Sequence, residues 1–249
     1  MRQLKVAIGL MVVGGVLTTV AFLMAFFTAE VQGFGSVTLA EQIKTSFTLL
    51  GQNAQGFEYA RPWFSQKIFY FHVPVAEASF LVLLTAAYLS IRFLMTRDKT
   101  YDTKARVAME VALLFVVLTM ITGVLWTKAS WGVWWDWEPR LTTYFIMTLL
   151  IIAYFVLRNS IEDEERRAVY AAVFAIIAAI DAPISFFITR LIPSNHPVVF
   201  QSGMATSNLA PFIVAQIGML MIGWAIYTMR MSEERLNERV DMAKELLEG

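Results

Sequence analysis

Cysteine is absent from this chain of 249 residues, and only 16% of its residues are charged. The absence of cysteine excludes disulfides, thiolate metal sites, iron–sulfur clusters and covalent haem attachment through a C-x-x-C-H motif. Soluble domains carry about 25% charged residues. A charged share of 16% beside 57% hydrophobic residues therefore favours an integral membrane protein. Basic and acidic residues number 20 each, so the net charge suggests no nucleic-acid partner.

Six apolar segments are long enough to cross a bilayer, which takes about 20 residues. We expect each to form a helix, because lipid offers no other partners for the backbone polar groups. The sequence thus predicts an all-α integral membrane protein with six transmembrane helices. The first segment is longer than a signal-peptide core and lacks a small-residue cleavage site, which indicates a retained anchor. The segments are Val6–Phe27, Ile68–Ile91, Val107–Trp126, Leu141–Leu157, Ala168–Thr189 and Leu209–Met229.

Lysine and arginine placement predicts the orientation, because these residues concentrate in cytoplasmic loops. With the N-terminus inside, 14 of the 20 basic residues fall on the inner side. Both termini are then cytoplasmic, and the connection between the third and fourth spans is an outer loop. Residues 1–229 form the six-helix transmembrane domain, and residues 230–249 form a charged cytoplasmic helical tail. We interpret this tail as a solvated end, with docking to a partner as the alternative.

The chain has two histidines, and both are predicted to lie on the outer side. His72 stands in "FYFHVPVA" and His196 in "SNHPVV". Two imidazoles can ligate a haem iron from opposite sides, or bind another transition metal. A zinc site is less favoured, because no third ligand stands at helical spacing from either histidine. The alternative is that both are ordinary polar residues of the membrane interface.

Four tryptophans lie within seven residues of the outer stretch "WGVWWDWEPR", residues 131–140. On a helix, Trp131, Trp134, Trp135 and Glu138 would share one face, with Trp137 pointing elsewhere. Since Pro139 disfavours helix at the residue before it, we expect a short helical turn followed by a break. An aromatic belt at the lipid headgroups is the ordinary explanation, but it needs only one or two indoles. Four indoles form a broad apolar surface that suits a large planar ligand such as haem.

Several outer cations could bind the two haem propionates, arginine through a two-pronged hydrogen bond. Arg140 is the best candidate because it adjoins the tryptophans. Each cation alone could instead set the topology or bind lipid phosphate. The other candidates are Lys128, Arg61 and Arg190.

Two acids, Glu77 and Asp181, fall within predicted spans. Acids at such depth are costly and usually face the bundle interior or a water-filled cavity. Pro183 can break the fifth span, and the Asp181 carboxylate could then accept from the freed backbone donors. We favour structural roles for both acids; tuning a ligand pKa or passing protons is the alternative.

The segment "WGVWWDWEPRLT" resembles the tryptophan-rich WWD signature of haem-handling proteins in cytochrome c biogenesis. "FYFHVPVA" resembles the histidine motif that opens the second span of the cytochrome c maturation protein C (CcmC) family. The resemblance covers most of the chain, including six spans and a histidine in each flanking outer segment. Two positions depart from the family pattern: Glu138 replaces the usual aspartate, and Pro139 replaces a small residue. Asp136 is an extra acid at a variable position, to which we give no function beyond hydration.

The resemblance implies that haem b is held at the outer face of the bacterial inner membrane. His72 and His196 would be the axial ligands of the haem iron. The indoles would lie against the ring, with Glu138 and Arg140 beside them. The protein would present haem to the membrane-anchored chaperone CcmE, within or beside an ABC-type complex of CcmA and CcmB with the small subunit CcmD. Any ATP dependence belongs to another subunit, because this chain has no G-x-x-x-x-G-K-[ST] loop.

Three other functions remain open. A haem–apocytochrome c ligase shares the WWD motif but has additional spans and a further pair of transmembrane histidines. A membrane b-type electron-transfer protein usually holds its haems between helices within the bilayer, with four histidines for two haems. A small-molecule transporter would have paired broken helices near the bilayer midplane, which the sequence does not indicate. The sequence therefore favours a haem-binding and haem-delivery protein over a stand-alone enzyme.

Overall fold

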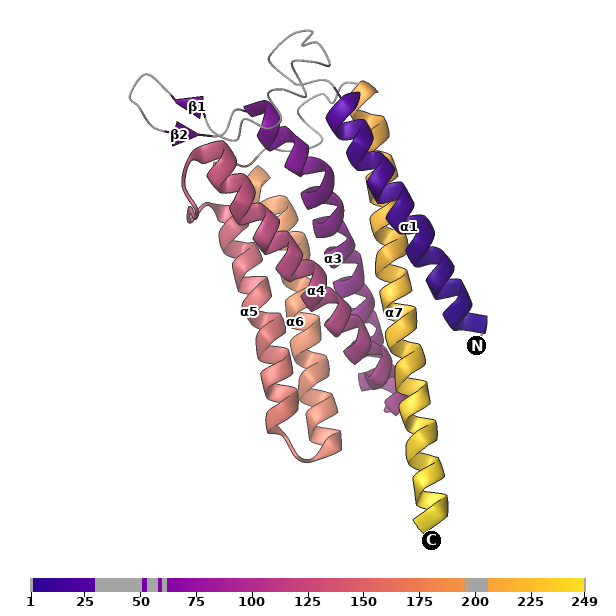
Figure 1. Ribbon diagram of the computed structural model, residues 1–249. Helices are drawn as coiled ribbons and strands as arrows, with labels where there is room; N and C mark the ends of the chain where they lie inside the picture. Colours follow the sequence, from indigo (N-terminus) through magenta and orange to yellow (C-terminus); the bar gives the residue numbers. More distant parts are fainter. Residues whose placement is uncertain are drawn as a thin grey trace.

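The computed structural model is a bundle of long helices (Figure 1), and it describes residues 2–29, 51–52, 58–59, 62–194, 196 and 206–248. A short antiparallel pair, β1 (Gly51–Gln52) and β2 (Glu58–Tyr59), precedes the second long helix. The helices are α1 (Arg2–Phe27), α3 (Pro62–Thr96), α4 (Lys99–Trp131), α5 (Pro139–Ser160), α6 (Glu164–Leu191) and α7 (Thr206–Glu248). All six are long and apolar enough to cross a membrane, which confirms the predicted fold class of a multi-pass membrane protein.

The helices are longer than the predicted spans, because helical backbone continues into the polar ends. α4 begins at Lys99 rather than near Val107, and α7 continues without a break through Met229 to Glu248. The tail after Met229 is therefore part of a transmembrane helix. Its first turns are tied to α4 by Arg230, which donates to Glu110 Oε2 at 2.7 Å, and by an ion pair of Arg106 with Glu234.

Short connections join α3 to α4 and α5 to α6. Arg97 takes a left-handed backbone conformation with φ 58°, and Asp98 then caps α4 by accepting from the Thr100 N–H at 2.9 Å. Asp163 caps α6 in the same way, accepting from the Arg166 N–H at 2.7 Å. Both turns lie at the end of the bundle that also holds the two chain termini (Figure 1). The connection between α4 and α5 lies at the opposite end.

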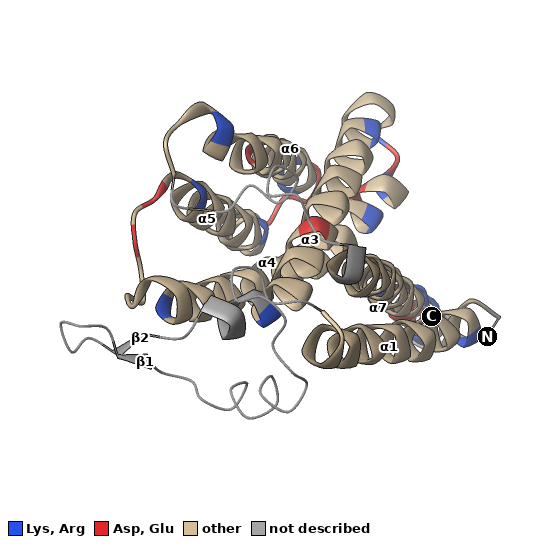
Figure 2. Ribbon diagram, turned by 90° about the horizontal axis from the view of Figure 1, so that it is seen from above, with Lys and Arg blue, Asp and Glu red and all other residues tan. Residues whose placement is uncertain are grey.

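Small residues bring α6 close to its neighbours. Its buried positions are seven alanines and one serine, which allow helices to approach closely in a membrane. Seen from above, charged residues stand mainly at helix ends and on connections (Figure 2). A charged pair also joins α5 to α4: Arg158 of α5 donates to both carboxylate oxygens of Asp102 of α4, at 2.7 and 2.8 Å. The buried alanines are Ala168, Ala171, Ala172, Ala175, Ala178, Ala179 and Ala182, followed by Ser185.

Pro183 does not break α6, which runs continuously from Glu164 to Leu191. A proline within a helix removes one backbone hydrogen bond without necessarily ending the helix. The buried Oδ2 atom of Asp181 has no hydrogen-bond partner among the described residues. Glu77 is partly buried on α3.

Candidate functional site

The tryptophan-rich segment begins where α4 ends. Gly132 takes φ 78°, a left-handed conformation that favours glycine, and its N–H donates to the Lys128 carbonyl at 3.2 Å. Residues 132–138 are not helical, and α5 starts at Pro139. The expected common helical face of Trp131, Trp134, Trp135 and Glu138 is therefore wrong, because Trp131 is the last residue of the helix.

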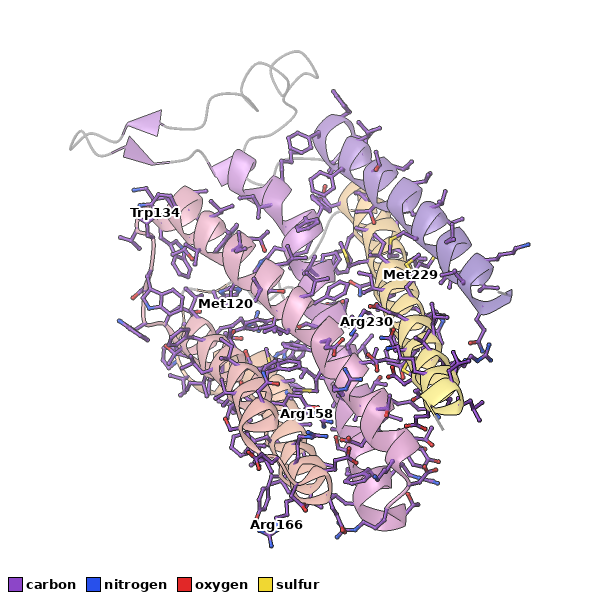
Figure 3. All side chains as sticks on the ribbon, turned by 60° about the horizontal axis from the view of Figure 1, so that its bottom comes forward. Met120, Trp134, Arg158, Arg166, Met229 and Arg230 are labelled. Atoms are coloured by element: carbon purple, nitrogen blue, oxygen red, sulfur yellow. The ribbon has the colours of Figure 1, made fainter. Side chains whose placement is uncertain are left out.

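The four tryptophans divide into separate groups. Trp131 packs edge-on against Trp126 of α4, with ring centroids 5.1 Å apart. Trp135 and Trp137 pack edge-on against each other at 5.3 Å, and both contact Phe145 of α5. Trp134 is 59% exposed, and it lies at one end of the bundle while Arg166 lies at the other (Figure 3).

Glu138 and Pro139, the two departures from the family pattern, start α5 together. Glu138 is the N-cap, and its Oε1 accepts from the Leu141 N–H at 2.7 Å. Pro139 occupies the first helical position, where a missing N–H costs nothing and a fixed φ suits the helix. This arrangement buries the Glu138 carboxylate, which is 4% exposed, at the same end of the bundle as the tryptophans.

His72 lies on α3 and faces α4. Its Nδ1 lies 2.8 Å from the hydroxyl of Thr122. A Cβ at Gly123 would lie 3.2 Å from the imidazole Cε1, so the absence of a side chain there makes room for the ring. This contact engages Nδ1 and leaves Nε2 as the nitrogen for a ligand.

His196 stands between aromatic rings and the Glu138 carboxylate. Its ring centroid lies 5.4 Å from that of Trp126 and 6.3 Å from that of Trp131. Its Nδ1 is 3.5 Å from Glu138 Oε1, which is long for a hydrogen bond but close for an electrostatic contact. Ser194 links the two residues: its hydroxyl donates to Glu138 Oε2 at 2.5 Å and accepts from the His196 backbone N–H at 3.0 Å.

The charge states of this group follow from its contacts. Burial raises the pKa of Glu138, but hydrogen bonds outweigh that effect and lower it to about 2. The contact with His196 lowers it most, followed by the bonds from Ser194 and the Leu141 N–H. Burial in turn lowers the pKa of His196, which keeps the imidazole neutral. An ionised carboxylate therefore faces a neutral imidazole. His72 lies within electrostatic range of both His196 and Arg140.

The basic side chains that could bind the haem propionates already make some contacts within the protein. Arg140 Nη2 donates to the Phe186 carbonyl at 2.9 Å and to Thr189 Oγ1 at 3.1 Å, which ties the start of α5 to the end of α6. Lys128 donates to the Gly132 carbonyl at 2.9 Å. Arg190 lies over the rings of Phe186 and Phe187. Arg61 is outside the described residues.

Trp135 Nε1 and Arg140 Nε are among the buried donors that have no acceptor among the described residues. Buried polar groups in native proteins nearly always have a partner, so these N–H groups suit an acceptor supplied by a ligand. Carboxylates are such acceptors. The residues present therefore fit a haem, with imidazole nitrogens for its iron and buried donors for its propionates.

Three site residues escaped the sequence analysis. Trp126 was placed at the end of a span, yet its ring contacts His196. Thr122 precedes it by one helical turn, and the i, i+4 spacing puts both on one face of α4. That spacing could have identified Thr122 and Trp126 from the sequence. Ser194 could not be identified in this way, because its role depends on the fold of the connection after α6.

Comparison with known proteins decides the family. The family model described as "Heme exporter protein C" (CcmC) matches residues 21–245. This chain belongs to the CcmC family. It is 30% identical to Heme exporter protein C of Bradyrhizobium diazoefficiens over 179 residues, covering 70% of this chain and 68% of that protein.

Two further relatives are more distant or shorter in coverage. The putative cytochrome c biosynthesis ccmC-like mitochondrial protein of Marchantia polymorpha is 32% identical over 49% of this chain and 50% of its own length. Heme exporter protein C of Escherichia coli K12 is 23% identical over 67% of this chain and 69% of its own length. Membership of the CcmC family gives the chain a haem-handling role in cytochrome c maturation.

Proposed function

We propose that this CcmC-family protein binds haem b as cargo at the end of the bundle that holds the α4–α5 connection. His72 and His196 supply the two axial nitrogens. Trp131, Trp135 and Trp126 border the ring, Trp134 and Trp137 extend the apolar surface, and Arg140 with Trp135 donates to the propionates. One observation carries this proposal: the two histidines, from distant parts of the sequence, contact α4 one helical turn apart, His72 at Thr122 and His196 at Trp126.

The site faces the outer side of the bacterial inner membrane in this proposal, as the distribution of basic residues indicates. From there haem passes to the membrane-anchored chaperone CcmE. CcmA, CcmB and the small subunit CcmD form the ABC-type complex beside it. This chain holds haem and hands it over, and the step that forms the bond to the acceptor belongs jointly to haem, the acceptor and the complex.

Absorption spectra of the purified protein, oxidised and reduced, test the proposal. The native protein supplied with haem should show a haem band, and His72→Ala and His196→Ala should each shift or abolish it. Chaperone loading should fall in Trp135→Ala and His72→Ala. Trp224→Ala is the matched control, because Trp224 is an exposed indole on α7 that contacts Tyr227 rather than the site. A native protein that takes up no haem would refute the proposed function.

A further inference from the structure

The two candidate ligands differ in the group that faces Nδ1. For His72 this group is the Thr122 hydroxyl, at 2.8 Å. That hydroxyl has one proton, and the carbonyls of Leu118 and Thr119 lie 2.8 and 3.1 Å from its oxygen. Because the proton goes to a backbone carbonyl, the oxygen accepts from Nδ1–H of the imidazole. His72 is therefore held as the Nδ1–H tautomer, and its Nε2 carries the lone pair.

For His196 the group that faces Nδ1 is a carboxylate. Glu138 Oε1 lies 3.5 Å from Nδ1. Little of either side chain is exposed: that of Glu138 is 4% exposed and that of His196 is 14% exposed. The bonds from Ser194 and Leu141 fix both carboxylate oxygens. Ser194 also accepts from the His196 backbone N–H, so the histidine and its carboxylate are held as one unit.

We infer that the two axial ligands are unequal: Glu138 makes His196 the retained ligand, and Thr122 leaves His72 the exchangeable one. This inference rests on the proposed function. A carboxylate partner increases the donor strength of a ligating imidazole, whereas a neutral hydroxyl orients the ring without adding charge. Thr122 and Glu138 are thus positioning residues, which act through the histidines.

The inference assigns a direction to haem delivery. His72 yields its bond to the iron, and an incoming neutral nitrogen donor takes its place, while His196 stays bound. One iron–nitrogen bond breaks and one forms, with no net transfer of protons or electrons. Free imidazole can serve as the incoming donor in an experiment.

The tautomer of His72 can be measured without haem. The chain has two histidines, so nitrogen NMR of ¹⁵N-histidine-labelled protein contains two imidazoles. Thr122→Val keeps the shape of the side chain and removes the acceptor, and it should convert His72 to a mixture of tautomers while leaving His196 unchanged. Thr228→Val is the control, because Thr228 makes the same bond to its own helix, to the Trp224 carbonyl at 2.8 Å. An unchanged His72 tautomer in Thr122→Val would overturn the role of Thr122.

The inequality itself is tested by haem retention. His72→Ala should lose less haem through purification than His196→Ala and accept imidazole at the open position. His196→Ala should lose at least about tenfold more haem, in line with the 10–100-fold effects of outer ligand partners. Glu138→Gln keeps an oxygen for the N-cap and removes the charge, so it should raise the haem midpoint potential and bring retention close to that of His196→Ala. Equal retention in the two histidine variants would refute the inference alone, whereas a native protein without haem would refute the proposed function.

Discussion

Gly123 offers a test of how closely His72 must be held. In Gly123→Ala the new Cβ would lie 3.2 Å from Cε1 of His72, 3.9 Å from Nδ1 and 4.0 Å from Nε2. Because non-bonded carbons prefer about 3.5–4.0 Å, the imidazole must shift by a few tenths of an ångström. Such a shift would lengthen the contact with Thr122 and turn Nε2 away from its position.

We expect opposite effects on haem binding and on stability. Haem affinity should fall about tenfold, or about 1.4 kcal/mol, because ligands tolerate little displacement and outer contacts affect metal affinity by 10–100-fold. The haem-free protein should be as stable as the native one or more so, since alanine favours a helix interior over glycine by up to about 1 kcal/mol. A haem titration followed by absorbance gives the first quantity, and thermal unfolding in detergent gives the second.

Gly15→Ala in α1 is the matched control. It makes the same change within a helix, and no heavy atom lies within 4 Å of the added Cβ in the described structure. It should share the gain in stability and keep native haem affinity. If Gly123→Ala bound haem as tightly as Gly15→Ala, the argument that His72 is a positioned ligand would be wrong.

Two further predictions concern Trp126 and the Arg158–Asp102 pair. Trp126→Ala removes the ring that packs on His196 and Trp131, so haem retention should fall severalfold, measured by the ratio of haem to protein absorbance, while Trp224→Ala retains native binding. The Arg158 and Asp102 side chains are only 10% and 16% exposed. Arg158→Gln therefore leaves a largely buried carboxylate without its two-pronged partner, and it should lower the free energy of unfolding by about 3 kcal/mol. The double variant Arg158→Gln with Asp102→Asn should recover part of that loss; no recovery would show that the two residues act separately.

The spans could be predicted from the sequence because a bilayer imposes a minimum length of apolar helix. Their ends could not, since capping depends on single residues. α4 extends back to Lys99, where the Asp98 carboxylate caps it by accepting from the Thr100 N–H, and α7 continues past Met229 because Arg230 has partners on α4. Neither contact leaves a periodic signal in the hydropathy of the chain.

The site was predictable in its residue types and only partly in its geometry. The two histidines and the tryptophan cluster are visible in the sequence, because they are rare or dense there. The division of the indoles is not, because it follows from the left-handed conformation of Gly132, which ends the helix after Trp131. Trp126 ends a predicted span, where a tryptophan is expected as an ordinary membrane-interface residue. Its contact with His196 depends on the fold and could not be predicted from the sequence.

The departure at Glu138 and Pro139 has a physical explanation that joins the fold to the site. Proline at the first helical position fixes the start of α5, and the residue before it must then cap the helix. Glu138 does so with one carboxylate oxygen, and its other oxygen accepts from Ser194. The same carboxylate faces Nδ1 of His196. A residue that begins a transmembrane helix thus also sets the electrostatic environment of the histidine, so the position of this candidate ligand depends directly on where α5 starts.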